Sequence, residues 1–195
     1  MIDKQTEKKV KIINKTVESM KKGNKGLSGV SLPDVAKELS MPLLELTQFF
    51  LTVEDVFLNE QKRINRKLEK YIDRKLATAK NPNDAKEILE GFLDKFIEIL
   101  PLNAEVILAA TFYLPLCLEE RKRAKANYKI KLKMIIKKGW PGKIESVLDR
   151  QTDLVLLSLY GFYDYCSRVK IGERREVLID FKNMLNLHLQ DRLFF

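Results

Sequence analysis

The chain has 195 residues, of which 45% are hydrophobic and 32% are charged. Such a chain can bury a hydrophobic core, so it is not intrinsically disordered by composition and needs no disulfide or metal staple. Its net charge of +9 suits an anionic partner, such as nucleic acid or an acidic membrane surface, without identifying one. Because the two cysteines lie far apart and His188 is the only histidine, we expect a reducing cytoplasmic location and neither a metal site, a cofactor nor catalytic activity.

No segment predicts insertion into a membrane. The first fifteen residues are charged and lack the apolar core of a signal peptide. The longest apolar run, Val106 to Leu118, contains Pro115 and is too short to span a bilayer. We therefore expect a soluble protein with no membrane partner.

Apolar residues recur at helical spacing along most of the chain, which predicts an all-α fold. The first helix, with Val10, Ile13, Val17 and Met20 on one face, should end before Gly23. The later helices are expected near residues 32–39, 42–50, 52–79, 84–99, 103–113, 115–138, 144–167 and 173–190. Residues 103–138 could instead form one helix with a kink at Pro115.

Residues 30–57 have the spacing of a helix-turn-helix motif. Ala36 is small enough for two helices to cross closely, and Ser40 lies in the turn that follows. Apolar residues are spaced to be buried between the two helices, namely Val35, Leu39, Met41, Leu46 and Phe49. Other helical hairpins share this spacing.

The same segment resembles the TetR family of bacterial repressors. Asp34-Val35-Ala36 match the family's Asp-Ile-Ala, Phe49-Phe50 match its Tyr-Phe, and Glu54-Asp55 match the Glu-Asp that opens its fourth helix. The resemblance covers roughly residues 8–60, and the rest of the chain agrees only in length and helix count.

This resemblance implies a homodimeric repressor that binds a pseudo-palindromic site on double-stranded DNA and is released by a small, largely apolar ligand. It also implies a DNA-binding domain at 1–55, followed by a long connecting helix within a ligand-binding and dimerisation domain at 56–195. The residues expected to contact DNA are Ser31, Pro42, Leu43, Leu44, Glu45, Thr47, Gln48, Lys22 and Lys25.

The second helix of the motif departs from the family in its charge. No positive charge lies between Met41 and Leu51, and Glu45 would face phosphates or base edges. Affinity for phosphates would then have to come from the lysine-rich first helix and the loop after it. Gln48 could bond an adenine edge, and Leu43 or Leu44 could touch thymine methyl groups. The alternative is a module that keeps the fold and binds a protein or small-molecule partner instead of DNA.

A second basic region, residues 121–143, contains ten basic residues and no acidic residue. One interpretation is a solvated helix face, with Tyr128 and Leu132 turned toward the core. The other is a surface that binds an acidic partner or the DNA backbone.

The C-terminal half predicts a dimer and a ligand pocket. The last two helices are apolar on more than one side, which favours a two-fold four-helix interface with a second copy. The expected interface residues are Leu157, Tyr160, Gly161, Leu178, Phe181, Leu185 and His188. The expected pocket residues are Phe92, Phe96, Phe112, Tyr113, Leu116, Cys117 and Tyr128, each of which could instead simply fill the core.

Overall fold

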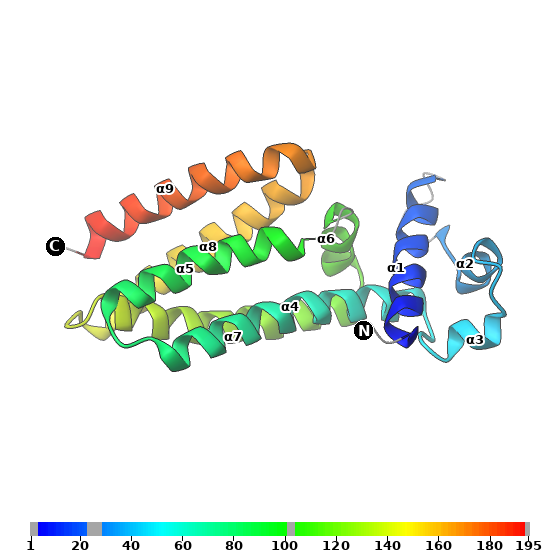
Figure 1. Cartoon of the computed structure of the whole chain (residues 1–195), viewed down its shortest axis with the longest axis horizontal. Coiled ribbons are helices and arrows are strands. Elements are labelled where there is room, and N and C mark those ends of the chain that lie inside the picture. The colour runs from blue at the N-terminus through cyan, green and yellow to red at the C-terminus, as the bar shows by residue number, and fades with distance from the viewer. Residues whose placement is uncertain (1–3, 23–28, 101–103, 194–195) are drawn as a thin grey trace. The chain divides into compact units, whose positions relative to one another are not determined.

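The computed structural model describes residues 4–22, 29–100 and 104–193. Within these ranges all regular structure is helical, which confirms the all-α prediction. In chain order (Figure 1) the elements are α1 (Lys4–Lys22), α2 (Leu32–Glu38), α3 (Leu43–Thr47), α4 (Val53–Thr78), α5 (Pro82–Ile99), α6 (Ala104–Tyr113), α7 (Pro115–Gly139), α8 (Glu145–Arg168), the short 3-10 helix η2 (Ile171–Glu173) and α9 (Arg174–Leu193).

Side-chain caps determine where several helices begin. Before α4, Thr52 Oγ1 accepts a hydrogen bond from the Asp55 amide at 3.1 Å, and Asp55 Oδ2 accepts one from the Thr52 amide at 2.9 Å. Asn81 and Asp84 form the same reciprocal pair before α5, and backbone hydrogen bonds from Lys80 and Asn81 lower the pKa of the Asp84 carboxyl. These pairs satisfy backbone donors that a helix start leaves open. They also explain why the helix starts lie close to their predicted positions.

The chain divides into two compact units. The first unit contains residues 1–63 and 106–120, and the second contains residues 64–105 and 121–195. From the sequence we predicted a domain boundary after residue 55, whereas the division between the two units lies within α4, after residue 63. The first unit, which holds the helix-turn-helix segment, also includes residues 106–120. Both α4 and α7 contribute their first turns to the first unit and their remainder to the second.

The core of the first unit consists of two apolar clusters. One joins α1, α2, α3 and the start of α4 through Ile12, Val35, Leu46 and Val56, each of which is fully buried. The other contains Val17, Met20, Phe57, Ile107 and Cys117. Because α6 and the start of α7 supply part of this second cluster, they help to bury the second half of α1.

The junction of α6 and α7 is a break between two helices rather than a kink in one. Pro115 begins α7, and Glu54 Oε1 accepts a hydrogen bond from the Leu116 amide at 2.6 Å. The carboxylate of Glu54, in the first turn of α4, thus satisfies a donor that the helix start leaves open. This contact lies within the first unit.

A single large apolar cluster fills the second unit. Its buried residues come from α4, α5, α7, α8 and α9, including Ile72, Leu93, Leu132, Leu148 and Leu189. Helices α4 and α7 run in the same direction. The Tyr128 hydroxyl of α7 hydrogen-bonds to Asn65 of α4, and Lys131, later in α7, pairs with Asp73, later in α4. Helices α8 and α9 lie side by side (Figure 1), and α5 also packs on α9.

In the part of the chain that the structure describes, no single helix is long and apolar enough to cross a bilayer. The bent pair of α5 and α6 meets that test by length and composition only.

Candidate nucleic-acid interface

Helices α2 and α3 form the helix-turn-helix that the sequence predicted. Val35 and Ala36 of α2 and Leu46 of α3 are buried where the two helices meet. The Met41 amide donates to the Ala36 carbonyl at 3.0 Å, which closes the turn. Ser31 Oγ caps α2 by accepting from the Asp34 amide at 3.3 Å, so this predicted DNA contact also has a structural role.

Ser40 occupies the strained position of the turn. Its φ of 51° lies in the left-handed region, which residues with a Cβ atom adopt at a cost. Glycine adopts this conformation without that cost, because it has no Cβ atom.

Replacing Ser40 with glycine should therefore stabilise the protein. Relief of left-handed strain is worth about 1–2 kcal/mol, and the greater freedom of glycine in the unfolded chain offsets about half of it, leaving a gain of about 0.5–1 kcal/mol. Urea denaturation followed by circular dichroism measures the change. Ser40→Val is the matched control and should destabilise, because β-branching makes the left-handed region less accessible. A Ser40→Gly variant less stable than the wild type would contradict this account.

Helix α3 presents hydrocarbon to the solvent. Leu44 is 77% exposed and Leu43 is 42% exposed, while Pro42 and Gln48 are also exposed. Thr47 is half-buried, and its hydroxyl donates to the Leu44 carbonyl at 3.0 Å. The outward surface of this helix therefore consists mainly of leucine side chains with the Gln48 amide beside them.

The acidic residue of α3 is paired. Lys8 Nζ of α1 lies 2.5 Å from Glu45 Oε1. The sequence placed Glu45 toward DNA as an unfavourable charge, but it could not show that α1 brings a lysine to it. This ion pair neutralises the carboxylate locally and ties α3 to α1.

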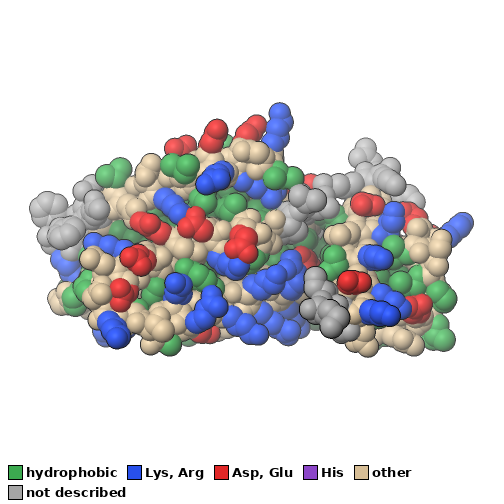
Figure 2. All heavy atoms as spheres, in the orientation of Figure 1, with side chains coloured by type: hydrophobic (Ala, Val, Ile, Leu, Met, Phe, Trp, Pro, Cys, Tyr) green, Lys and Arg blue, Asp and Glu red, His purple; other side chains and the backbone are tan. Residues whose placement is uncertain are grey.

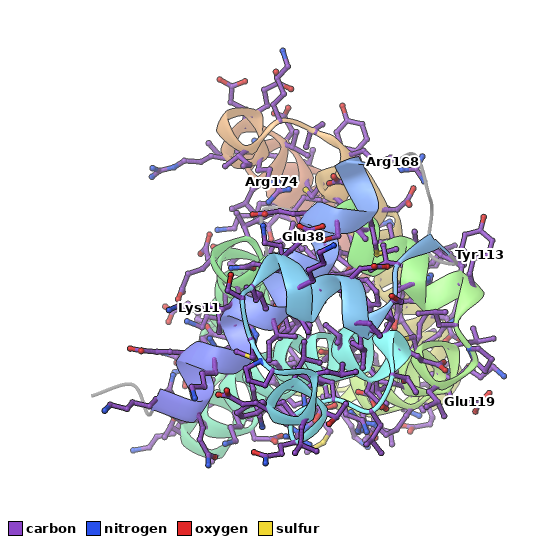
Figure 3. The ribbon with its side chains drawn as sticks, turned by 90° about the vertical axis from the view of Figure 1, so that its right-hand side faces the viewer. Lys11, Glu38, Tyr113, Glu119, Arg168 and Arg174 are labelled. Atoms are coloured by element: carbon purple, nitrogen blue, oxygen red, sulfur yellow. The ribbon has the colours of Figure 1, made fainter. Side chains whose placement is uncertain are left out.

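Lysines on α1 form a basic stripe beside α3. Lys4, Lys8, Lys11 and Lys15 are three or four residues apart and share one helix face. Lys15 also contacts Glu18 at 3.1 Å and Glu38 of α2 at 3.5 Å, and the hydrogen bond to Glu18 raises its pKa. Figure 3 shows Lys11 on α1 and Glu38 at the end of α2.

Two other lysines that the sequence assigned to DNA contact yield less information. Lys22 is the last residue of α1, but its side chain is not among the described parts of the structure. Lys25 lies wholly outside the described residues. The cations that the described residues bring next to the helix-turn-helix are therefore those of the stripe on α1.

Five of the ten cations of the second basic region, including Lys137, pair with carboxylates on other helices. Lys129 of α7 pairs with Asp153 at 2.6 Å, and Lys133 lies 2.6 Å from both Glu145 and Asp149. Two further cations of α7 pair with carboxylates of α4, namely Arg123 with Glu69 and Lys131 with Asp73. Figure 2 shows acidic and basic side chains intermingled on the visible face of the second unit. With Tyr128 and Leu132 buried, the arrangement supports the interpretation of α7 as a solvated helix face.

The predicted ligand-pocket residues fall in different units. Phe92, Phe96 and Tyr128 are buried in the second unit, where the Phe92 and Tyr128 rings meet edge to face at 5.9 Å. The other four belong to the first unit, which holds Phe112, Tyr113, Leu116 and Cys117. Of these, only Cys117 is buried, and burial raises the pKa of its thiol to about 12, so the thiol stays protonated. Tyr113 projects outward in Figure 3.

A groove between α4 and α7 was not predicted from the sequence. Its volume is about 510 Å³, and it lies in the second unit. The lining residues are Glu69, Asp73, Leu76, Ala77, Asn127, Ile130, Lys131 and Met134. The exposed Ile130 and Met134, which interrupt a lysine-rich stretch, were the available signal in the sequence.

The predicted interface residues on α8 and α9 divide into exposed and buried sets. Leu157 and Gly161 are exposed, and Tyr160 is half-buried beneath Arg121, whose guanidinium carbon lies 5.2 Å from the ring centroid. In contrast, Leu178 and Leu185 are buried within the unit itself.

Two further predicted interface residues, on α9, also make contacts within the unit. Phe181 stacks on Phe162 with ring centroids 4.3 Å apart, and a ring nitrogen of His188 lies 2.9 Å from Gln151 Oε1. A charge at Phe181 would therefore disturb the core as well as any interface. Further exposed apolar residues on these two helices are Leu154, Tyr165, Ile179, Met184 and Leu187.

Comparison with known proteins bears on the fold. No family model matches the chain, and no curated protein matches its sequence. A transcriptional regulator of the TetR/AcrR family from Thermobifida fusca YX-ER1 has a TM-score of 0.62 at 17% identity, covering 92% of this chain and 96% of that one. A protein described as a transcriptional regulator from Pseudomonas aeruginosa PAO1 has a TM-score of 0.62 at 13% identity, covering 98% and 96%. The chain therefore has a TetR-like fold.

Proposed function

We propose that this chain is a dimeric transcriptional regulator of TetR type that represses by binding a pseudo-palindromic operator. The observation that carries the proposal is a helix-turn-helix whose α3 exposes side chains able to contact bases, beside a lysine stripe on α1. The two solved structures named above are described as transcriptional regulators. Each dimer would place two copies of α3 in successive major grooves.

The different charges of α1 and α3 suit the two helices to different contacts with DNA. Phosphate contacts supply most of the non-specific affinity of a DNA-binding protein and require cations. Helix α3 has none, so Lys4 and Lys11 are proposed to contact phosphates while Gln48 and the leucines face the bases. Lys8 already neutralises Glu45, so its contribution to phosphate binding is smaller.

The proposed ligand is a small, largely apolar molecule that acts through the second unit. Phe92, Phe96 and Tyr128 are the three predicted pocket residues that lie together there, in one apolar cluster. The Tyr128 hydroxyl lies 3.2 Å from Asn65 Oδ1, so this cluster also contains a polar pair. Residues 112–117 are not part of the proposed ligand site, because they belong to the other unit.

Selection of bound duplexes from a random library by the full-length purified chain tests DNA binding. With a selected duplex, Lys11→Ala should weaken binding to all sequences. It should reduce the slope of log affinity against log salt by about one unit for each lysine removed, which is about two units per dimer. Lys70→Ala is the matched control, because Lys70 is an exposed lysine of the second unit and its loss changes the net charge equally. Gln48→Ala should instead relax the base preference at one position per half-site. Failure to retain any duplex at low salt would support the alternative, a module that binds a protein partner through Leu43 and Leu44.

A further inference from the structure

Helix α3 has five residues, and two of its three leucines are exposed. Leu46 alone satisfies the need of α3 for a core residue, because it is fully buried. Leu43 and Leu44 therefore contribute little to the stability of the unit, and Leu44 leaves most of its surface in water. Leu43 and Leu44 are consecutive on this short helix, so together they form an apolar surface that is available for contact.

The polar groups around these leucines leave the contact surface uncharged. Lys8 holds the Glu45 carboxylate, and the Thr47 hydroxyl donates to the backbone of α3. Of the residues from Pro42 to Gln48, this leaves Gln48 as the exposed side chain with hydrogen-bonding groups. The surface that a major groove would meet is thus chiefly apolar.

Among the base edges of the major groove, one offers an apolar group. Thymine presents its C5 methyl, whereas guanine presents two acceptors and cytosine a donor. A leucine placed over guanine or cytosine would remove water from polar groups without replacing their hydrogen bonds, which is unfavourable. Over thymine, the same leucine buries a methyl group.

We propose that Leu43 and Leu44 select the operator by contacting thymine methyl groups, so that each half-site has thymines beneath α3. This inference rests on the proposed DNA-binding function and names the feature of the DNA that is read. It assigns specificity to hydrocarbon contacts rather than to the Glu45 carboxylate, which pairs with Lys8.

The experiment replaces thymine with 2′-deoxyuridine in a duplex selected by the full chain. Deoxyuridine pairs with adenine in the same way and lacks only the methyl group. Each methyl contact removed should weaken binding about fourfold, the effect of exposing one buried methylene-sized group. The same replacement in the sequence flanking the half-sites should leave the affinity unchanged.

Two variants show which side chain makes the contact. Leu44→Ala should bind thymine and deoxyuridine duplexes with nearly equal affinity. Leu51→Ala is the matched control, because Leu51 is 78% exposed but lies outside Pro42–Gln48, and it should keep the fourfold difference. The ratio of the two affinities is the readout, so a general loss of affinity or stability in a variant does not imitate the expected result.

Three outcomes are distinguishable. A thymine preference that Leu44→Ala abolishes supports the proposal. A chain that binds a selected duplex but does not distinguish deoxyuridine from thymine overturns the methyl contact and leaves the DNA-binding function standing. A chain that binds neither duplex overturns both and directs attention to an apolar protein partner for the two leucines.

Discussion

The Leu157→Asp variant should be a monomer in solution, whereas the unaltered protein should be a dimer of about twice the 22.7 kDa chain. Leu157 is 69% exposed on α8, and it shares a helix face with the exposed Leu154, Gly161 and Tyr165. An aspartate there would be buried by a second copy without a partner for its charge, which disfavours association. Light scattering at micromolar concentration measures the mass.

Loss of the dimer should also reduce operator affinity by about 10²-fold or more, because two linked helix-turn-helix segments bind far more tightly than one. Ile130→Asp is the matched control. Ile130 is an exposed apolar residue of the same unit, on α7 rather than α8 or α9, and its replacement should leave the mass unchanged. A wild-type monomer, or a Leu157→Asp dimer, would rule out this interface.

Replacing Gly91 with alanine should destabilise the second unit, although alanine is the better helix former. A Cβ atom at Gly91 in α5 would lie 2.0 Å from the Tyr71 hydroxyl oxygen of α4, a distance that forces the Tyr71 side chain out of its position. Overpacking of this kind costs about 1–3 kcal/mol. Urea denaturation of the variant gives the change in the free energy of unfolding.

The Tyr71→Phe change provides the control for this prediction. Without the hydroxyl oxygen, the nearest ring atom to the new Cβ lies at 3.2 Å, which a small adjustment relieves. The double variant should therefore recover most of the lost stability and reveal the helix preference for alanine, about 1 kcal/mol. If Gly91→Ala were as stable as the wild type, or if Tyr71→Phe failed to rescue it, the close contact would not be the cause.

The helices were predictable because their signals are local. The caps at Thr52 and Asn81, the proline that opens α7 and the apolar spacing in α1 each act within a few residues. The small Ala36 and the turn at Ser40 likewise identified the helix-turn-helix. In these segments local preference and tertiary packing agree, which makes the sequence informative.

The site residues were less predictable because their environment depends on distant partners. Lys8 and Glu45 are 37 positions apart, and no periodicity indicates that they form an ion pair. The lysines of α7 likewise meet carboxylates of α4 and α8 that only the tertiary structure brings to them. The aromatic residues predicted to line one pocket were chosen for their apolar character, which does not reveal that Phe112 and Phe92 belong to different units.

Under the proposed function, the paired lysines of α7 would affect how the protein finds its operator among competing sequences. A protein with two equally attractive basic faces is held on random DNA in two orientations, and only one of them is productive. Here carboxylates of the same unit neutralise much of the α7 charge, while the stripe on α1 flanks the helix-turn-helix. Encounters steered by charge would then favour the orientation in which α3 already faces the groove, and a larger fraction of collisions would test the sequence.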